Sequence, residues 1–230
     1  MTKIKLDIRS QTAKEEFDYL WYTLKQLPFF KKNNYTVELP NHPVFKKLAQ
    51  KSPKFGKVDK DILFNLFKKE IYDPDFFKQG IVVLESYRPI FDKAILEFIE
   101  MNKKWGFKIF PKYNILLTRY GPGGSYNPDK ANIIMMTSIN GTFKKSHPEE
   151  TVIHEIIHMG IEKNIVNCFG LNHWEKERLV DLICALKFGD ILPNYQIQQQ
   201  GNKKIDYYIT SKSIDQLPKA VEKYVTDFPR

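Results

Sequence analysis

The chain contains very few cysteines. Among 230 residues only Cys168 and Cys184 occur, and neither lies in a CxxC pair. Small secreted domains that depend on disulfides carry more cysteines at closer spacing, and cysteine-ligated zinc ribbons need CxxC pairs. The sequence therefore excludes both classes, and we expect the two thiols to be buried.

Long apolar runs are also missing. No stretch approaches the roughly 18 to 20 apolar residues of a membrane-spanning helix, and the first residues, MTKIKLDIRSQT, lack the apolar segment of a signal peptide. From the sequence we expect a cytoplasmic protein with no membrane partner.

Charge of one sign does not gather in blocks. The net charge of +9 comes mostly from lysine pairs spread along the chain, and there is no arginine-rich block or basic-aromatic array. Dispersed lysines are typical of solvated surfaces, so a nucleic-acid partner is not expected. The 42% hydrophobic content is that of a chain that folds around a core.

Helical periodicity dominates the first part of the sequence. Apolar residues recur at helical spacing over 13–27, where Pro28 is expected to end the helix, and again over 61–72. The stretch between them, about residues 28–59, contains many lysines and prolines and indicates loops with at most short structure. We predict a helical N-terminal extension over residues 1–75, which is either a prosegment or part of the same domain as residues 76–230.

A β-rich pattern follows the longest helical signal, which covers 81–105 and is interrupted at Pro89. FKIF (107–110), NILLTRY (114–120) and NIIMMTS (132–138) predict strands, whereas GPGGSYNPD (121–129) indicates a loop. Together with the helices this predicts an α+β fold with a small sheet. Near the end of the chain we expect a short strand over 205–210 and a last helix over 213–226.

HEIIH, residues 154–158, carries the chemistry. It lies in a predicted helix that starts near Ser146, in a possible capping box with Glu149, and runs to about 164. On a helix, positions i and i+4 share a face, so His154 and His158 can bind one cation, while Glu155 can reach a water bound to it. The pattern predicts a Zn²⁺ site with Glu155 as general base.

ERLVD, residues 177–181, supplies the carboxylates for this site. It lies in a second predicted helix, over 172–188, and Glu177 follows His158 by 19 positions. Glu177 can be the third metal ligand, because its helical edge can face the first helix. Asp181 is one turn further on, where a carboxylate can accept a hydrogen bond from the outer nitrogen of a liganding histidine and fix its tautomer.

HEIIH followed by ERLVD resembles the HExxH…ExxxD arrangement of the gluzincin, thermolysin-like zinc metallopeptidases, over about residues 150–186. The resemblance implies a zincin-like fold and a hydrolase that cleaves peptide bonds in a peptide or protein substrate. It places His154, His158 and Glu177 as metal ligands and Glu155 as the catalytic base. It also implies an edge strand that binds the substrate backbone, and NIIMMTS is expected to be that strand.

A group that stabilises the substrate oxyanion is needed as well. In gluzincins it is usually a histidine or tyrosine located after the ligand helix. By position alone Tyr207 and Tyr208 are candidates, with Tyr195 behind them, whereas Tyr126, His42 and His147 give no functional signal.

Two alternatives stay open at this stage. His173 follows His158 by 15 positions, a spacing that resembles the SprT-like three-histidine proteases, which act on DNA-associated proteins. Trp174 stands where a glycine is expected in that group. Glu175 is a further possible ligand, although its i+4 partner, Leu179, cannot orient a histidine. The second alternative is a non-catalytic binding or scaffold protein with a zincin-like fold.

Overall fold

A four-stranded sheet lies at the centre of the molecule. The computed structural model describes residues 4–199 and 201–229, and its strand order is β1-β2-β4-β3. Strands β1 and β4 run parallel to β2 on either side of it, and β3 pairs antiparallel with β4. The bounds are β1 (Lys5–Ser10), β2 (Lys112–Thr118), β3 (Gly124–Asn127) and β4 (Asn132–Met136).

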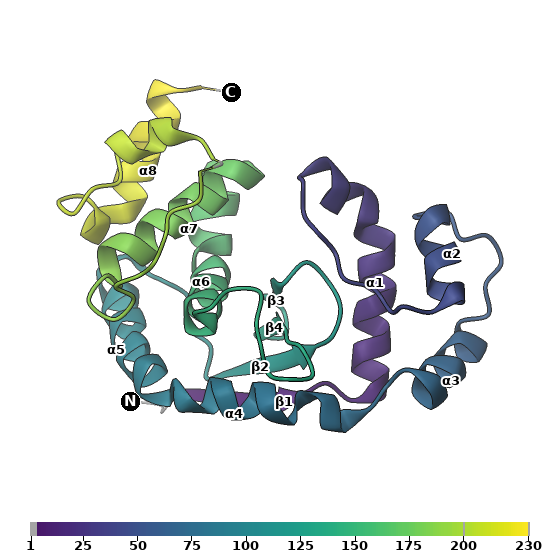
Figure 1. Cartoon of the computed structure of the whole chain (residues 1–230). Helices are drawn as coiled ribbons and strands as arrows, with labels where there is room; N and C mark the ends of the chain where they lie inside the picture. Colours follow the sequence, from purple (N-terminus) through teal and green to yellow (C-terminus); the bar gives the residue numbers. More distant parts are fainter. Residues whose placement is uncertain (1–3, 200, 230) are drawn as a thin grey trace.

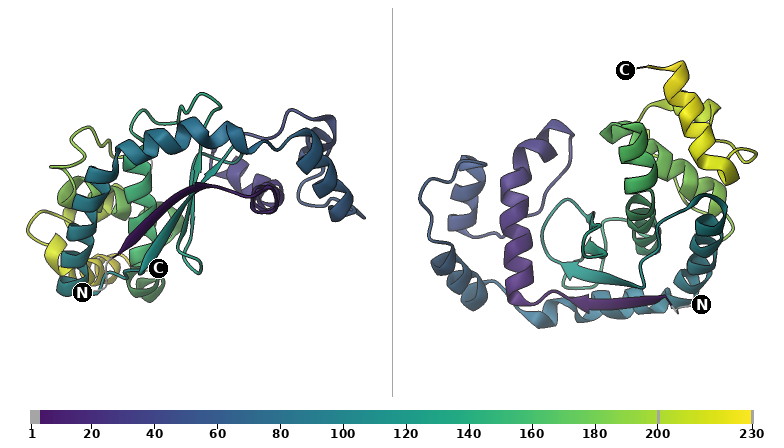
Figure 2. Two further views of the ribbon diagram at one scale, coloured as in Figure 1. Left: turned by 90° about the horizontal axis from the view of Figure 1, so that it is seen from below. Right: turned by 180° about the vertical axis from the view of Figure 1, so that it is seen from behind.

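Two groups of helices stand on opposite sides of this sheet (Figure 1). Helices α1 to α3 form one group and α5 to α8 the other, while α4 runs beside β1, as Figure 2 also shows. The α+β class expected from the sequence is confirmed. The helices are α1 (Ala13–Lys32), α2 (Pro43–Lys51), α3 (Lys60–Glu70), α4 (Lys78–Ser86), α5 (Arg88–Trp105), α6 (Pro148–Ile161), α7 (His173–Lys187) and α8 (Leu217–Asp227).

Each group of helices has its own hydrophobic core. The N-terminal helical segment, which we define as α1 to α3 (residues 13–70), encloses a small cluster with three phenylalanines at its centre. The larger core lies between the sheet and α4 to α8. The small cluster consists of Phe17, Leu20, Leu24, Phe45, Leu48, Leu63 and Phe67.

The region predicted as a helical extension, residues 1–75, also contributes a strand. β1 pairs with β2 along its whole length, from Lys5 opposite Lys112 to Ser10 opposite Leu117. The helical segment is joined to the sheet through Glu16, whose carboxylate accepts hydrogen bonds from Thr118 Oγ1 at 3.0 Å and from the Arg119 amide at 2.8 Å. Residues on both sides of position 75 thus build one sheet.

The strand assignments need correction at the edge. NIIMMTS was expected to be the edge strand, but β4 lies inside the sheet between β2 and β3. The edge strand on this side of the sheet is β3, within the GPGGSYNPD stretch that the glycines and prolines had indicated to be a loop; β1 forms the other edge. Pairing with β4 overrides that weak local propensity, because β3 gains its backbone hydrogen bonds from an established neighbour.

Helix α1 does not end at Pro28, contrary to the expectation, but continues to Lys32. A proline inside a helix leaves the carbonyl four residues earlier without its donor. Here that carbonyl, of Leu24, accepts a hydrogen bond from Ser52 Oγ at 2.6 Å. Ser52, which directly follows α2, thus offsets much of the free-energy cost of a proline inside a helix.

Three smaller expectations were also wrong, namely those for FKIF, for the strand over 205–210 and for Cys168. FKIF is not a strand, and its Lys108 amide bonds to the Gly160 carbonyl at the end of α6. Residues 203–207 form a 3-10 helix, capped by Asn202, where a strand was expected. The stretch over 28–59, expected to hold loops with at most short structure, contains the short helix α2, which begins after the side-chain cap of His42. Cys168 is exposed, whereas Cys184 is buried as expected.

Within the described ranges, 4–199 and 201–229, no helix combines the length and the apolar character that crossing a bilayer requires.

Candidate metal centre

Helix α6 carries HEIIH through the middle of the large core. Its apolar residues Val152, Ile153, Ile156, Ile157 and Ile161 are all buried, as the helical stripe predicted. Gly160 allows close contact with Phe107, because a Cβ at that position would lie 1.9 Å from the phenylalanine ring. Packing around the whole helix fixes its rotation, and therefore the direction of its histidines.

The start of α6 differs from the expected capping box. The N-cap is His147, which makes no side-chain capping bond, and Pro148 follows at the first helical position. Glu149 is buried and bonds to His147 Nδ1 at 3.2 Å instead of reaching back to Ser146. The fixed backbone angle of proline at this position is compatible with a helix start without a side-chain cap.

Helix α7 lies beside α6 (Figure 1) and begins at a true capping box. The Asn172 side chain accepts a bond from the Glu175 amide, and the Glu175 side chain bonds back to the Asn172 amide. Glu175 also accepts a hydrogen bond from Tyr224 at 2.6 Å. It is therefore used in capping the helix, whereas Glu177 and Asp181 face α6.

The structure brings His154, His158 and Glu177 together. The two Nε2 atoms of His154 and His158 are 3.0 Å apart. Glu177 Oε2 lies 3.5 Å from Nε2 of His154 and 3.4 Å from Nε2 of His158. Among the described residues this is the group of three or more histidine, cysteine or acidic side chains whose ligand atoms lie close enough to hold a metal ion.

The spacing of these three atoms fits zinc. Tetrahedral ligands at about 2.0 to 2.1 Å from Zn²⁺ are separated from each other by about 3.3 Å. The three observed separations are 3.0, 3.5 and 3.4 Å. Two imidazole nitrogens and one carboxylate oxygen are also a donor set that zinc prefers, and three protein ligands leave its fourth position open.

The electrostatics of the group favour the ionisation states in which Glu177 and His158 bind a metal. Burial by itself raises the pKa of Glu177, but His158 and His154 outweigh it and hold this pKa well below its usual value. Burial lowers the pKa of His158. The arrangement thus keeps Glu177 ionised and favours a neutral His158, the protonation states in which both side chains bind a metal.

Tyr195 joins Asp181 to the first histidine. Asp181 is fully buried, and its Oδ1 lies 3.6 Å from His154 Nδ1, beyond direct hydrogen-bond distance. The Tyr195 hydroxyl donates to Asp181 Oδ1 at 2.6 Å and lies 2.8 Å from His154 Nδ1. Because the phenol proton goes to Asp181, the oxygen accepts the proton of His154 Nδ1–H. Nε2 of His154 is then the nitrogen that faces the metal position. Burial lowers the pKa of His154, but its contacts with Cys184 and Glu177 outweigh burial and raise this pKa well above its usual value, so a metal would displace a proton from Nε2.

Glu155 is buried next to the edge strand. A Cβ added to Gly124 of β3 would lie 2.7 Å from Glu155 Oε1, so the glycine leaves room for this carboxylate. Burial raises the pKa of Glu155 to about 7, with a smaller raising contribution from Glu177 and lowering contributions from His154 and two lysines. A carboxylate with a pKa near neutrality suits proton transfer in both directions.

Tyr126 is a site residue that the sequence gave no reason to select. Its ring stacks on His158 with centroids 5.0 Å apart and planes 8° apart. Its hydroxyl donates to Glu162 at 2.8 Å and accepts from Lys176 at 2.9 Å. Tyr126 comes from β3 and Glu162 from the π-helix Glu162–Asn167 that follows α6, so this contact depends on the tertiary fold.

His173 lies outside the ligand group. Its Nδ1 is 3.8 Å from Glu177 Oε1, the oxygen that does not face the two histidines. Its Nε2 is 3.3 Å from the hydroxyl of Tyr35, which follows α1. It therefore contacts the outer side of Glu177 and the N-terminal helical segment, a position that does not support the three-histidine arrangement.

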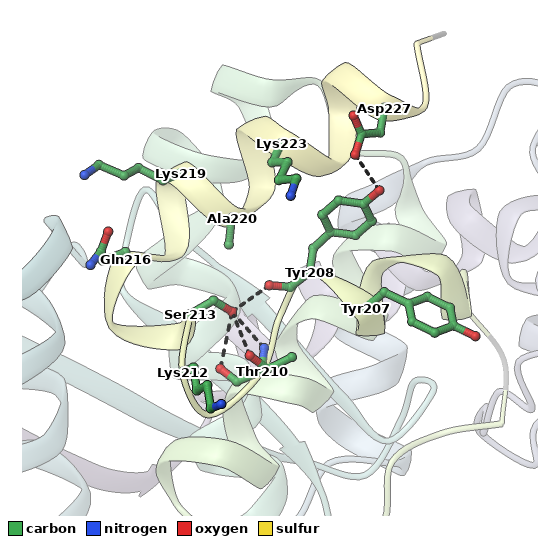
Figure 3. Close-up of a pocket in the computed structure, with 10 residues that line it drawn as sticks. All are labelled: Tyr207, Tyr208, Thr210, Lys212, Ser213, Gln216, Lys219, Ala220, Lys223 and Asp227. Carbon is green, nitrogen blue, oxygen red and sulfur yellow. Dashed lines mark hydrogen bonds between the residues drawn. The ribbon is translucent and has the colours of Figure 1, made fainter.

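The other tyrosine candidates lie elsewhere. Figure 3 shows Tyr207 and Tyr208 at a surface pocket beside α8, with Tyr208 directed at Asp227. Tyr208 donates to that carboxylate at 2.7 Å, and Tyr207 is 86% exposed. These contacts do not involve the ligand group, and Tyr195 is committed to Asp181 and His154.

Comparison with known proteins gives no further guide to this site. No protein-family model, no curated protein and no solved structure matches the chain.

Proposed function

We propose that the protein is a zinc-dependent metallopeptidase of gluzincin type, in which His154, His158 and Glu177 hold the metal. The observation that carries the proposal is the triangle of two Nε2 atoms and one Oε2 atom, with separations of 3.0 to 3.5 Å. It is supported by the sequence order HExxH…ExxxD and by the position of Glu155 beside the triangle without belonging to it.

The chemistry follows from what each side chain does. Zinc, when bound by His154, His158 and Glu177, would act as a Lewis acid that lowers the pKa of a water and polarises a carbonyl group. Glu155 takes a proton from the attacking water and afterwards delivers it to the leaving amine. In the metal-free chain burial raises the pKa of Glu155 to about 7, which favours its action as a base and then as an acid near neutral pH. Tyr195 and Asp181 keep His154 in the tautomer that presents Nε2.

The edge strand offers a place for the substrate backbone. β3 is the last strand of the sheet, and its Gly124 lies against Glu155. An extended peptide that adds to such an edge uses main-chain hydrogen bonds and tolerates many sequences. We infer that a peptide or protein substrate lies along β3, which gives the fold a zincin-like arrangement of edge strand and active-site helix.

Metal analysis and one substitution test the proposal. The purified full chain is expected to bind one zinc per molecule, and to hydrolyse members of a broad peptide library. Glu155→Gln keeps the size of the side chain but removes its basicity, so hydrolysis should fall by roughly 10² to 10⁴ while zinc remains bound. Glu150→Gln, at another buried carboxylate of α6, is the matched control and should keep its activity.

Three outcomes contradict the proposal. A chain that binds no zinc after purification and zinc addition would be a binding module rather than an enzyme. Zinc binding without hydrolysis of any peptide would make it a non-catalytic metal scaffold. Full activity in Glu155→Gln would show that the chain is a peptidase but that Glu155 is not its general base.

A further inference from the structure

The stretch that follows α1 contacts His173, which is the neighbour of Glu177 on its outer side. The Tyr35 hydroxyl lies 3.3 Å from His173 Nε2, and the Phe29 ring is 5.7 Å from the His173 ring in an edge contact. His173 Nδ1 is in turn 3.8 Å from Glu177 Oε1. In Figure 1 this is the point at which the end of α1 turns toward the start of α7. A single imidazole therefore separates Tyr35 from a metal-ligating carboxylate.

The backbone of this stretch is held at both ends. The Tyr35 amide bonds to the Phe30 carbonyl at 2.9 Å. Glu38 forms an antiparallel bridge with Gly121, in which each amide donates to the other's carbonyl at 2.9 Å. Gly121 lies just before β3, so the bridge places residues 35–38 beside the start of the edge strand. Backbone hydrogen bonds on both sides thus fix the position of Tyr35.

The negative charges of Glu177 and Glu155 act on the Tyr35 hydroxyl. Burial is the main cause of its raised pKa, followed by the negative charges of Glu177 and Glu155. The hydroxyl accordingly keeps its proton near neutral pH and serves as a hydrogen-bond donor.

Other tyrosines near the site are already committed. Tyr195 donates to Asp181, Tyr126 donates to Glu162, and Tyr19 shares a hydrogen bond with Ser125 at 3.0 Å. Tyr35 has a long contact to an imidazole nitrogen, which a better acceptor can replace. An oxygen that gains negative charge at the metal position is such an acceptor.

We propose that Tyr35 donates a hydrogen bond to an oxygen bound at the metal centre, which in the proposed peptidase reaction is the substrate carbonyl oxygen. The inference rests on the proposed function. As the attacked carbon becomes tetrahedral, this oxygen gains charge and the hydrogen bond strengthens; no proton is transferred. Removing one such donor typically costs roughly 10² to 10³ in kcat. The N-terminal helical segment then completes the active site and does not merely cover it.

Tyr35→Phe in the full chain tests this directly. The matched control is Tyr22→Phe, which changes a tyrosine of α1 that is 54% exposed. We expect Tyr35→Phe to bind one zinc and to keep its melting temperature, to lose roughly 10² to 10³ in kcat, and to change KM little. The control should match the unmodified chain in every measurement.

A second readout does not depend on turnover. With Co²⁺ in place of zinc, the visible absorption bands report the binding of acetohydroxamate, a small oxygen ligand. Tyr35→Phe should weaken this binding about tenfold, the effect of one lost hydrogen bond. Tyr22→Phe should leave it unchanged.

The outcomes separate this inference from the proposed function. If the unmodified chain hydrolyses peptides and Tyr35→Phe changes neither kcat nor acetohydroxamate affinity, Tyr35 is not a donor and the peptidase stands. A rise in either quantity would mean that Tyr35 blocks the site, which also overturns the inference. If the chain binds metal but hydrolyses nothing, the peptidase proposal fails, and acetohydroxamate affinity alone decides for or against Tyr35. A chain that binds no metal overturns both.

Discussion

The N-terminal helical segment and the α6–α7 pair bury very different side chains. The small cluster between α1, α2 and α3 is made of phenylalanine and leucine. The α6–α7 pair lies in the larger core but encloses ionisable groups, among them His154, Glu155, His158 and Asp181. Burying such groups costs free energy unless each finds a partner. The comparison shows that the chain places most of these groups in its larger core, where extensive apolar packing offsets the cost, with Glu16 of α1 as the exception.

The difference also explains which region the sequence describes well. HEIIH and ERLVD place ligands at fixed offsets on helices, so local geometry alone brings His154 and His158 to one face. The pairing with Glu177 needs only that two consecutive helices lie side by side. An apolar cluster carries no such signal, because phenylalanine and leucine at helical spacing predict burial and nothing about chemistry.

The largest effect should come from Glu177. Glu177→Ala removes a proposed ligand, and we expect zinc affinity to fall by orders of magnitude. His173→Ala should still bind one zinc, because His173 contacts only the outer oxygen of Glu177. Competition with a chromogenic chelator measures both affinities. Loss of zinc in His173→Ala alone would replace the proposed ligand set with three histidines.

The sequence could not have predicted the contacts that cross the molecule. Tyr35 and His173, a pair 138 positions apart, meet because the end of α1 and the start of α7 come together. Tyr195 reaches His154 from a loop 41 positions later. The bond from Ser52 to Leu24, which lets α1 pass Pro28, is of the same kind. Spacing rules describe one element at a time, so they miss groups that only the tertiary fold brings together.

A cavity in the small core should affect stability and not metal binding. Phe67 is fully buried and contacts Phe17, Phe45, Tyr72 and Tyr120. Phe67→Ala should lower the free energy of unfolding by about 3 to 5 kcal/mol, measured in urea. Zinc affinity should stay the same, because every proposed ligand lies on α6 or α7. A fall in zinc affinity would show that the two regions are not independent.

The matched control for this cavity is on α3 as well. Ile62 is 65% exposed, so Ile62→Ala should change the free energy of unfolding by less than about 0.5 kcal/mol. An equal loss in both variants would mean that the loss at Phe67 does not come from a cavity in the small core, because alanine favours helix formation at either position.

Glu16, the buried carboxyl that ties the helical segment to the sheet, should make stability depend on pH. Burial raises its pKa from 4.5 to about 7, against smaller lowering effects of Arg119 and Thr118. The folded state therefore holds the proton more tightly than the unfolded state. The resulting stability is fully present below pH 4.5 and is lost as pH rises to about 7. The loss amounts to roughly 3 kcal/mol.

Glu16→Gln isolates this contribution, because the amide cannot titrate. The unfolding free energies of the two proteins are compared between pH 4.5 and 8. As pH rises, the unmodified chain should lose roughly 3 kcal/mol of unfolding free energy relative to Glu16→Gln. A difference that does not change with pH would show that Glu16 is ionised in the folded state, with Thr118 Oγ1 and the Arg119 amide compensating its burial.

The smallest effect should follow removal of the Tyr195 hydroxyl, and it tests how the large core controls its ionisable groups. Tyr195→Phe keeps the ring, which lies beside the His154 ring at 6.5 Å, but breaks the link from His154 Nδ1 to Asp181. His154 then loses the acceptor that fixes its tautomer, and zinc affinity or activity should fall about 10- to 100-fold.

Asp181→Asn should cause a loss of the same size as Tyr195→Phe. The double variant should be little worse than either single one, because both side chains act through one hydrogen-bonded chain. The control is Tyr208→Phe, which removes a hydroxyl that donates to Asp227 at the surface. Additive losses in the double variant would show that Asp181 reaches His154 without Tyr195, as the sequence alone suggested.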